Sequence, residues 1–477
     1  MDYWEIWLDA FADLWRTPFY YAALLLAALL LRRQTEIERK LFAVKVNAWW
    51  SGWWRSLLWG ALAGLAVSAA FLFAGASLSV PALILLWCTA LLLSILRIRF
   101  LCFAYAAGAI GLAQAALTWT NAEALPEIPS MIVREIQAVH LPSLFLLVGV
   151  LHLAEALLMK FAARRFASPV IFDGKRGKAL GGYRVQAVWP VPLLLAVPAG
   201  AAAGAEPPLP WPTLFGAIAG SEPAGWAAVA FPVLIGFRSW SLARNTWSMS
   251  AGGIVLLAGY GVLAAGAGVL LAYVPEWWAA AAASLLCFAL HDGLTGLVRR
   301  REWSQPPYFV HDGRGLKVLA VIPGTPAAEL GIGPGYVLRK VNGVPVLDRA
   351  GLHAALRLNP AFVKLEVLDR AGESRFMKRA LFANEHHQLG LVLCPDEKTS
   401  YVAETAEGGL FSPPRVRRSS GGGFGADAVR PRLALMPPRQ AEAGPSASPL
   451  PEAASGTETR TAPQDSPSEA SEERQPS

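Results

Sequence analysis

Four ionisable side chains stand inside apolar runs of the sequence, where charged groups are rare. His152 and Glu155 are three residues apart in the run 141–159, and His291 and Asp292 are adjacent near the end of the last long apolar run. Residues three apart on a helix share a face, and ionisable groups inside a membrane segment are costly, which makes them functional candidates. The chemistry that these residue types suggest is that of an intramembrane metalloprotease.

The spacing of these groups argues against that chemistry. A metalloprotease of this kind needs two His residues four apart with a Glu beside the first, and no HExxH motif occurs in the chain. P-loop, GxSxG and dinucleotide-binding fingerprints are also missing from the sequence, and the four Cys residues are not spaced as zinc ligands or as a disulfide framework. We therefore expect no catalytic residue, no metal ligand and no cofactor, and a structural pairing of the two His-containing helices.

The composition indicates that much of the chain lies in lipid. Of 477 residues, 54% are hydrophobic and only 16% are charged, and the mean hydropathy is +0.38, whereas soluble domains carry about 25% charged residues. Nine apolar runs approach the roughly 17–25 residues that a membrane helix needs: 17–31, 56–74, 80–96, 100–119, 141–159, 188–205, 214–237, 251–274 and 278–297. The sequence predicts a polytopic α-helical membrane domain over 17–301 with about eight or nine transmembrane helices. An amphipathic interfacial helix is expected at 1–16, and Glu222, Pro223 and Pro232 leave 214–237 open to a re-entrant reading.

Basic residues predict the orientation of the membrane domain. The net charge is +7, but most Lys and Arg residues flank apolar runs, which is the usual topology signal and not a sign of nucleic-acid binding. Basic and acidic connections alternate along the chain. We expect a multi-pass cell-membrane protein in contact with lipid, with no nucleic-acid partner, whose residues after Arg301 are cytoplasmic.

The basic loop 160–187 has β-prone runs on both sides of Asp173–Gly177, a pattern typical of a hairpin. Two readings stay open for this cytoplasmic loop. It faces anionic lipid and fixes the topology, or it is a docking surface for a partner or for the C-terminal module.

The composition becomes that of a soluble domain over 307–395. Turn and cap signals there predict a small barrel of five or six strands with two helices. The first helix is a short turn at Pro326–Leu330 that Gly331 ends, and the second begins after Asp348 and covers 349–358. The tail 396–477 is rich in Pro, Ser and Glu and poor in large apolar residues, and we expect it to be disordered.

The stretch VLAVIPGTPAAELGIGPGYVLRKVNGVPV resembles the core of a bacterial-type PDZ domain. The match is strong at Pro323–Ala327, Gly331, Gly335 and Val341–Gly343, and it departs at Tyr336, where the family usually has Asp. PDZ domains bind an extended C-terminal peptide by strand addition, and backbone N–H groups of a loop hold its carboxylate. The resemblance therefore implies a peptide groove in this module. A PDZ domain used only for packing or dimerisation is the alternative.

Two stretches could supply the carboxylate-binding loop. Gln388–Val392 matches the expected pattern better than Pro307–Val310 does, and its position implies a permuted strand order. The candidate groove residues are Leu389, Gly390, Leu391, Leu352, His353 and Leu356.

The layout of 1–395, the loop 168–192 and the PDZ-like module together resemble the MinJ family of Gram-positive cell-division proteins. The resemblance implies a non-enzymatic membrane scaffold that bridges the polar scaffold DivIVA to the division inhibitor MinC/MinD. Two other functional classes are weighed against it. One is a PDZ-containing regulator or subunit of a membrane-associated or intramembrane protease. The other is a transporter, which is disfavoured because interrupted helices do not recur in two matching halves.

Overall fold

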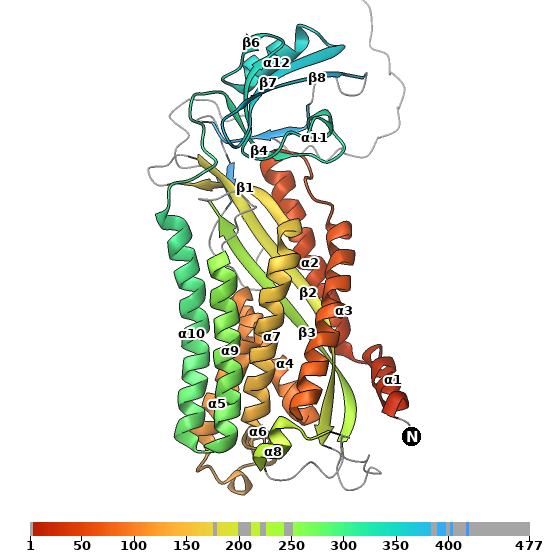
Figure 1. Cartoon of the computed structure of the whole chain (residues 1–477). Coiled ribbons are helices and arrows are strands. Elements are labelled where there is room, and N and C mark those ends of the chain that lie inside the picture. Colours follow the sequence, from red (N-terminus) through yellow and green to blue (C-terminus); the bar gives the residue numbers. More distant parts are fainter. Residues whose placement is uncertain are drawn as a thin grey trace, which may run out of the picture. The chain divides into compact units, whose positions relative to one another are not determined.

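The computed structural model describes residues 3–174, 179–198, 211–219, 226–242, 251–382, 389–396, 401–403 and 416–418. They all belong to one compact unit of residues 1–423. Before the C-terminal module, its α-helices are α1 (Tyr3–Leu14), α2 (Pro18–Phe42), α3 (Trp49–Ala74), α4 (Val80–Leu96), α5 (Phe103–Leu117), α6 (Glu127–Gln137), α7 (Leu141–Phe161), α8 (Leu214–Ala219), α9 (Ala251–Tyr273) and α10 (Trp277–Ser304) (Figure 1). Proline occupies the first turn of α2, α4 and α7, where its missing N–H has no helical partner to lose.

Fewer helices are long enough to cross a membrane than the sequence predicts. Within the described residues, four helices have the required length and hydropathy, namely α3, α7, α9 and α10, and a fifth span results if the pair α1 and α2, bent by 54°, is counted as one. The apolar helices α4 and α5 are shorter. The expectation of eight or nine transmembrane helices is therefore corrected to four or five.

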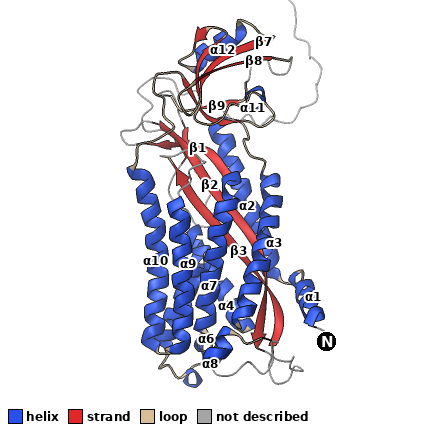
Figure 2. Ribbon diagram, viewed as in Figure 1, coloured by secondary structure: helices blue, strands red, loops and turns tan. Residues whose placement is uncertain are grey.

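Two of the predicted helices are long β-strands instead. Residues 188–198 of the first run fall in β2 (Ala179–Pro198), and the second half of the run 214–237 falls in β3 (Trp226–Ser241), after the short helix α8. With β1 (Ala167–Asp173) they form an antiparallel sheet of order β1-β2-β3, drawn in red beside the helices in Figure 2. An apolar run fits a buried strand as well as a helix, and Pro190, Pro192 and Pro232 oppose a helix because they cannot donate its hydrogen bonds.

Helix α3 covers the edge of β2 that β3 leaves open. Four small residues at four-residue spacing on α3 contact every second residue of β2. Four helical residues rise about 6 Å and two strand residues about 6.6 Å, so the two elements stay in register. The pairs are Ser56 with Val188, Gly60 with Pro190, Gly64 with Pro192, and Ser68 with Leu194.

Side chains of α3 and α4 bind part of the backbone of β2 and β3. The Ser56 hydroxyl donates to the Val188 carbonyl, and the Leu194 N–H donates to the Ser68 hydroxyl at 2.9 Å. Pro190 and Pro192, between them, carry no N–H. On β3, the Pro232 carbonyl accepts from the indole N–H of Trp87 at 2.6 Å. Non-helical backbone is tolerated at membrane depth only where protein satisfies it, and these side chains provide that satisfaction.

The described residues of 307–395 form six strands and two helices. The strands are β4 (Leu316–Val321), β5 (Val337–Val341), β6 (Val344–Pro345), β7 (Phe362–Leu368), β8 (Ser374–Ala380) and β9 (Leu391–Leu393), and the helices are α11 (Pro326–Glu329) and α12 (Arg349–Arg357). The sheet order is β8-β7-β5-β4-β9, with β6 paired to β5. The Asp348 carboxylate caps α12 by accepting from the Gly351 N–H at 2.7 Å, and Asn342 ties the turn after β5 to α12 by donating to the Ala355 carbonyl at 3.0 Å.

Part of the tail predicted to be disordered is ordered. Within 396–477, β10 (Tyr401–Ala403) and β11 (Val416–Arg418) pair as antiparallel strands. Ala403 is buried in one cluster with Val170 of β1 and Trp240 of β3. Burial of this short apolar segment against the three-stranded sheet offsets the entropy of ordering it, which the composition of the whole tail conceals. Most of the remaining tail lies outside the described residues.

Candidate peptide-binding site

The predicted loop lies at the edge of the module's sheet. In the part of the chain that the structure describes, β9 pairs with β4 and with no other strand, so it is an edge strand. Gly390, directly before β9, has φ +77°, and a β-carbon there would overlap the side chain of Thr325. Glycine is therefore required at this position. Gln388, the first residue of the predicted loop, lies outside the described residues.

Two hydrogen bonds hold this loop against the turn around α11. The Ile322 N–H donates to the Gly390 carbonyl at 2.9 Å, and the Ala327 N–H donates to the Leu389 carbonyl at 3.0 Å. In a trans peptide the N–H points opposite to the carbonyl. The N–H groups of Gly390 and Leu391 consequently point away from the turn that binds the carbonyls. Neighbouring backbone N–H groups of this kind can hold an anion.

The predicted side chains divide into core residues and one exposed residue. Leu352 and Leu356 of α12 and Leu389 of the loop are buried together in the hydrophobic core of the module, so they join the loop to the helix rather than line an open surface. Leu391 is half-buried and His353 is exposed. Successive residues of a helix are about 100° apart around its axis. His353 directly follows the buried Leu352 and therefore faces solvent.

The alternative loop, Pro307–Val310, is already engaged elsewhere. The Gly181 N–H of β2 donates to the Phe309 carbonyl at 3.0 Å, and the Tyr308 N–H donates to the Leu242 carbonyl at 2.9 Å. Phe309 is fully buried. This stretch therefore connects the module to the β1–β3 sheet, and its geometry does not resemble a free loop.

A second face of the module packs on the loop region 160–187. Side chains alternate along β9: Leu391 and Leu393 face the module's own core, whereas Val392 and Cys394 cluster with Tyr183 of β2. The Tyr183 hydroxyl donates to the Leu319 carbonyl. Of the two readings of this loop, docking of the C-terminal module is the one that these contacts show.

The docked face also changes the chemistry of its cysteine. Burial raises the pKa of Cys394 to about 12, and the charge of Lys317 opposes that rise. The Lys317 ammonium donates to the Tyr308 carbonyl at 2.7 Å. No sequence pattern points to Tyr183 or Thr325, because their roles depend on partners far away in the chain.

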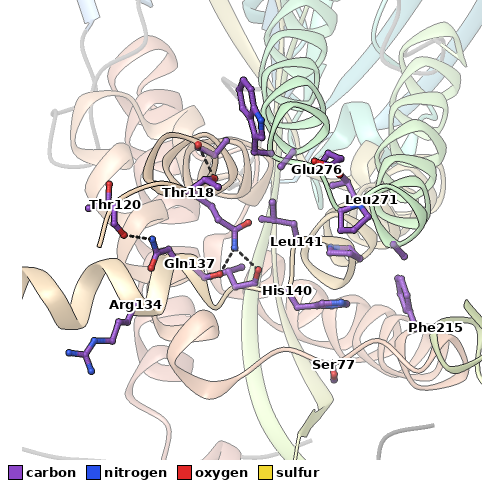
Figure 3. Close-up of a pocket in the computed structure, with 18 of the residues that line it drawn as sticks. Ser77, Thr118, Thr120, Arg134, Gln137, His140, Leu141, Phe215, Leu271 and Glu276 are labelled. Atoms are coloured by element: carbon purple, nitrogen blue, oxygen red, sulfur yellow. Dashed lines mark hydrogen bonds between the residues drawn. The ribbon is translucent and has the colours of Figure 1, made fainter. Parts of the chain in front are cut away.

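A cavity of about 940 Å³ lies at the other end of the helices, and Figure 3 shows the residues that line it. Its central amides bind the protein's own backbone. Gln114 donates to the carbonyls of Gln137 and Val139 at 2.8 and 2.9 Å, and Gln137 donates to the Thr120 carbonyl at 3.1 Å. These amides stabilise the connection between α5, α6 and α7.

Two helices, α7 and α10, bring three of the four ionisable groups of the apolar runs together. The rings of His152 on α7 and His291 on α10 are 5.1 Å apart, and Glu155 lies 4.0 Å from His152. Asp292 instead binds Arg99 at 3.1 Å and accepts from the Tyr105 hydroxyl at 3.3 Å.

Comparison with known proteins supports the family resemblance. The chain is 30% identical over 263 residues to the cell division topological determinant MinJ of Bacillus subtilis (strain 168), which is 55% of this chain and 64% of that protein. It is 34% identical over 84 residues to the probable cell division topological determinants MinJ of Lacticaseibacillus paracasei and of Lacticaseibacillus casei (strain BD-II), which is 18% of this chain and 23% of each relative. The matches thus span less than two thirds of these relatives. No family model and no solved structure matches the chain. The predicted likeness to MinJ is confirmed at the level of sequence.

Proposed function

We propose that this chain is a topological determinant of cell division, a non-enzymatic membrane scaffold that positions division-site regulators through protein contacts. The observation that carries the proposal is the 263-residue match to the Bacillus subtilis determinant. Four or five membrane-crossing helices support the membrane location. The partners proposed from the resemblance are a DivIVA-like polar scaffold and MinC/MinD.

The C-terminal module is proposed to be a PDZ domain with a permuted strand order. Its last strand, β9, follows β8 in the chain but pairs with β4, as a permuted arrangement requires. A partner's extended C-terminus would add to the free edge of β9, and the N–H groups of Gly390 and Leu391 would hold its carboxylate. His353, exposed on α12, would form the polar wall of the groove.

We place the module and the tail in the cytoplasm. The basic connections carry this assignment. The lower helix count leaves it unchanged, because the segments that no longer count as membrane helices come in neighbouring pairs, the short helices α4 and α5 and the strands β2 and β3. β2 and β3 run antiparallel, so a chain that passes along one and returns along the other reverses direction twice, as two helices would. The connections on both sides therefore keep their predicted sides.

The groove can be tested with one variant on each of its two sides and a control elsewhere in the module. Leu391→Pro removes the N–H at the free edge, where proline is tolerated, and His353→Glu places a like charge beside the incoming carboxylate. Ala371→Glu, exposed in the turn between β7 and β8, is the control, because β8 and β9 lie at opposite ends of the sheet order.

Fluorescent fusions of full-length protein give the readout. We expect wild type and Ala371→Glu to be enriched at septa and poles, and the two groove variants to insert normally but spread over the membrane. Septal enrichment of both groove variants would overturn the proposal that the groove binds the partner. A uniform signal for the wild type would overturn the scaffold itself.

A further inference from the structure

Three potential metal ligands from distant parts of the chain meet between the helices. They are the Cys102 thiol, which follows a short 3-10 helix and directly precedes α5, the His152 imidazole of α7 and the His291 imidazole of α10. The Cys102 Sγ lies 3.3 Å from His152 Nε2 and 3.7 Å from His291 Nε2. One ligand atom from each residue lies within 4.8 Å of the others.

The hydrogen bonds around the imidazoles direct lone pairs into this cluster. His152 Nδ1 lies 2.7 Å from the Val148 carbonyl, and a carbonyl can only accept. The proton is therefore on Nδ1, and the Nε2 lone pair faces Cys102. Metal-binding histidines usually have this second bond to a carbonyl or carboxylate. The His291 side chain is buried, with 8% of the residue exposed. Its Nε2 faces Cys102, and its Nδ1 has no hydrogen-bond partner among the described residues.

We propose that Cys102, His152 and His291 bind a zinc ion, and that the Glu155 carboxylate, which lies outside this cluster, turns toward the ion as the fourth ligand. Tetrahedral zinc with bonds of about 2.3 Å to sulfur and about 2.0 Å to nitrogen places these ligand atoms about 3.5 Å apart. The two sulfur–nitrogen distances, 3.3 and 3.7 Å, lie on either side of that value. Glu155 Oε2 is 4.0 Å from His152 Nε2 and comes from the same face of α7.

Charge and surroundings favour this ligand set. A thiolate and a carboxylate together cancel the two positive charges of the ion, so the loaded site is neutral, as an apolar interior requires. The ring of Tyr260 packs edge-on to both imidazoles, with centroids 4.8 and 5.2 Å away, and its hydroxyl is occupied by Cys287 at 2.9 Å. Four protein ligands make a closed structural site, which holds α5, α7 and α10 together and leaves no position for a substrate.

Metal analysis of the full-length protein tests the site. The protein is purified in detergent with a tag that lacks histidine, loaded with zinc and passed over a chelating resin. We expect about one zinc per chain, a loss of at least about tenfold in Cys102→Ala and His291→Ala, and no loss in Cys88→Ala, an exposed cysteine of α4.

Cobalt distinguishes a thiolate site from other binding and does not depend on the variants' folding. Cobalt-loaded wild type should show a thiolate-to-metal charge-transfer band that added zinc removes, and Glu155→Gln should keep the band while releasing metal faster to a chelator. Zinc that stays in both alanine variants, or wild type that holds less than about a tenth of an equivalent and shows no cobalt band, would overturn the proposal. The thiol would then only donate a hydrogen bond to His152.

Discussion

At the scale of single residues, close approach of helix and strand depends on two glycines of α3. A β-carbon at Gly60 would overlap the Pro190 carbonyl, and one at Gly64 would overlap the Pro192 carbonyl. A small residue every fourth position lets a backbone lie directly on the helix, a principle familiar from membrane helix pairs. Gly259 of α9, by contrast, has no neighbour within 4 Å of that position.

Gly60→Ala should therefore destabilise the protein, and Gly259→Ala should not. Overpacking of this kind costs about 1–3 kcal/mol, whereas alanine in place of an open helical glycine gains up to about 1 kcal/mol. The measurement is the melting temperature of the detergent-solubilised protein, followed by size-exclusion of heated samples. Equal melting temperatures for the two variants would contradict the packing of β2 on α3.

Asp369, in the turn between β7 and β8, carries a pH-dependent contribution. The backbone hydrogen bond from Glu373 lowers its pKa, burial opposes this, and the bond from Ala371 and the charge of Arg375 lower it further. The Arg375 guanidinium lies 2.8 Å from the carboxylate. Because the folded pKa is depressed, the stabilisation is fully present above about pH 4, the value for a free aspartate, and is lost as the pH falls through the folded value.

Asp369→Asn should consequently loosen this turn at neutral pH only. Hydrogen exchange of the peptide covering 369–375 should be faster in the variant than in wild type at pH 7. The two proteins should exchange alike at a pH below the folded pKa, when the wild-type carboxyl is also uncharged. A difference that persists unchanged in acid would show that the charge is not responsible.

At the scale of elements, the contact between the module's β4–β9 edge and β2 joins two parts with different solvents. Tyr183 and Phe309 lie between them, against Cys394. Cys394 reports on this contact, because burial both shields its thiol and raises its pKa to about 12. An exposed cysteine has a pKa of about 8.5 and reacts through its thiolate.

Phe309→Ala should make Cys394 reactive. Removal of the buried ring opens the docked face, so alkylation of the Cys394 peptide by a maleimide at pH 7.5, read by mass spectrometry, should accelerate at least about tenfold because the thiolate fraction rises with exposure. Phe382→Ala, an exposed phenylalanine of the same module, is the control and should leave the rate unchanged. Equal rates in all three proteins would indicate that the module is not held on β2.

At the scale of the whole molecule, the sidedness depends on how many times the chain reverses. The antiparallel strands β2 and β3 place Pro198 and Trp226 at the end opposite to Asp173 and Ser241. The chain then returns along α9 and α10 to the module. Basic residues accumulate at the module's end of these elements, including Arg299–Arg301.

Reporter fusions should confirm one orientation. A reporter that needs the cytoplasm should be active after Gln305, and alkaline phosphatase should be active when inserted in 199–225, because the Lys and Arg bias orients the helices. Both reporters are inserted into otherwise identical full-length chains, so that their expression levels can be matched. Phosphatase activity after Gln305 would reverse the assignment and place the groove outside the cell.

The sequence by itself determined what depends on nearby residues. Hydropathy identified α3, α7, α9 and α10, and the Asp348 cap and the Asn342–Gly343 turn predicted elements of the module, because capping and turn chemistry act within a few residues. The likeness to MinJ could also be read from motifs. The groove residues stay a prediction, since the sequence does not show that Leu352 and Leu389 are buried in the core of the module.

Only the tertiary structure decided between helix and strand for 188–198 and 226–241, because a continuous apolar run satisfies either when it is buried. It also decided that the covering partner is α3, whose small residues lie more than a hundred positions earlier in the chain. The meeting of Cys102, His152 and His291 has the same origin. These three residues are far apart in the sequence, so no short motif predicts them as a ligand set. They lie close together only when the helices pack.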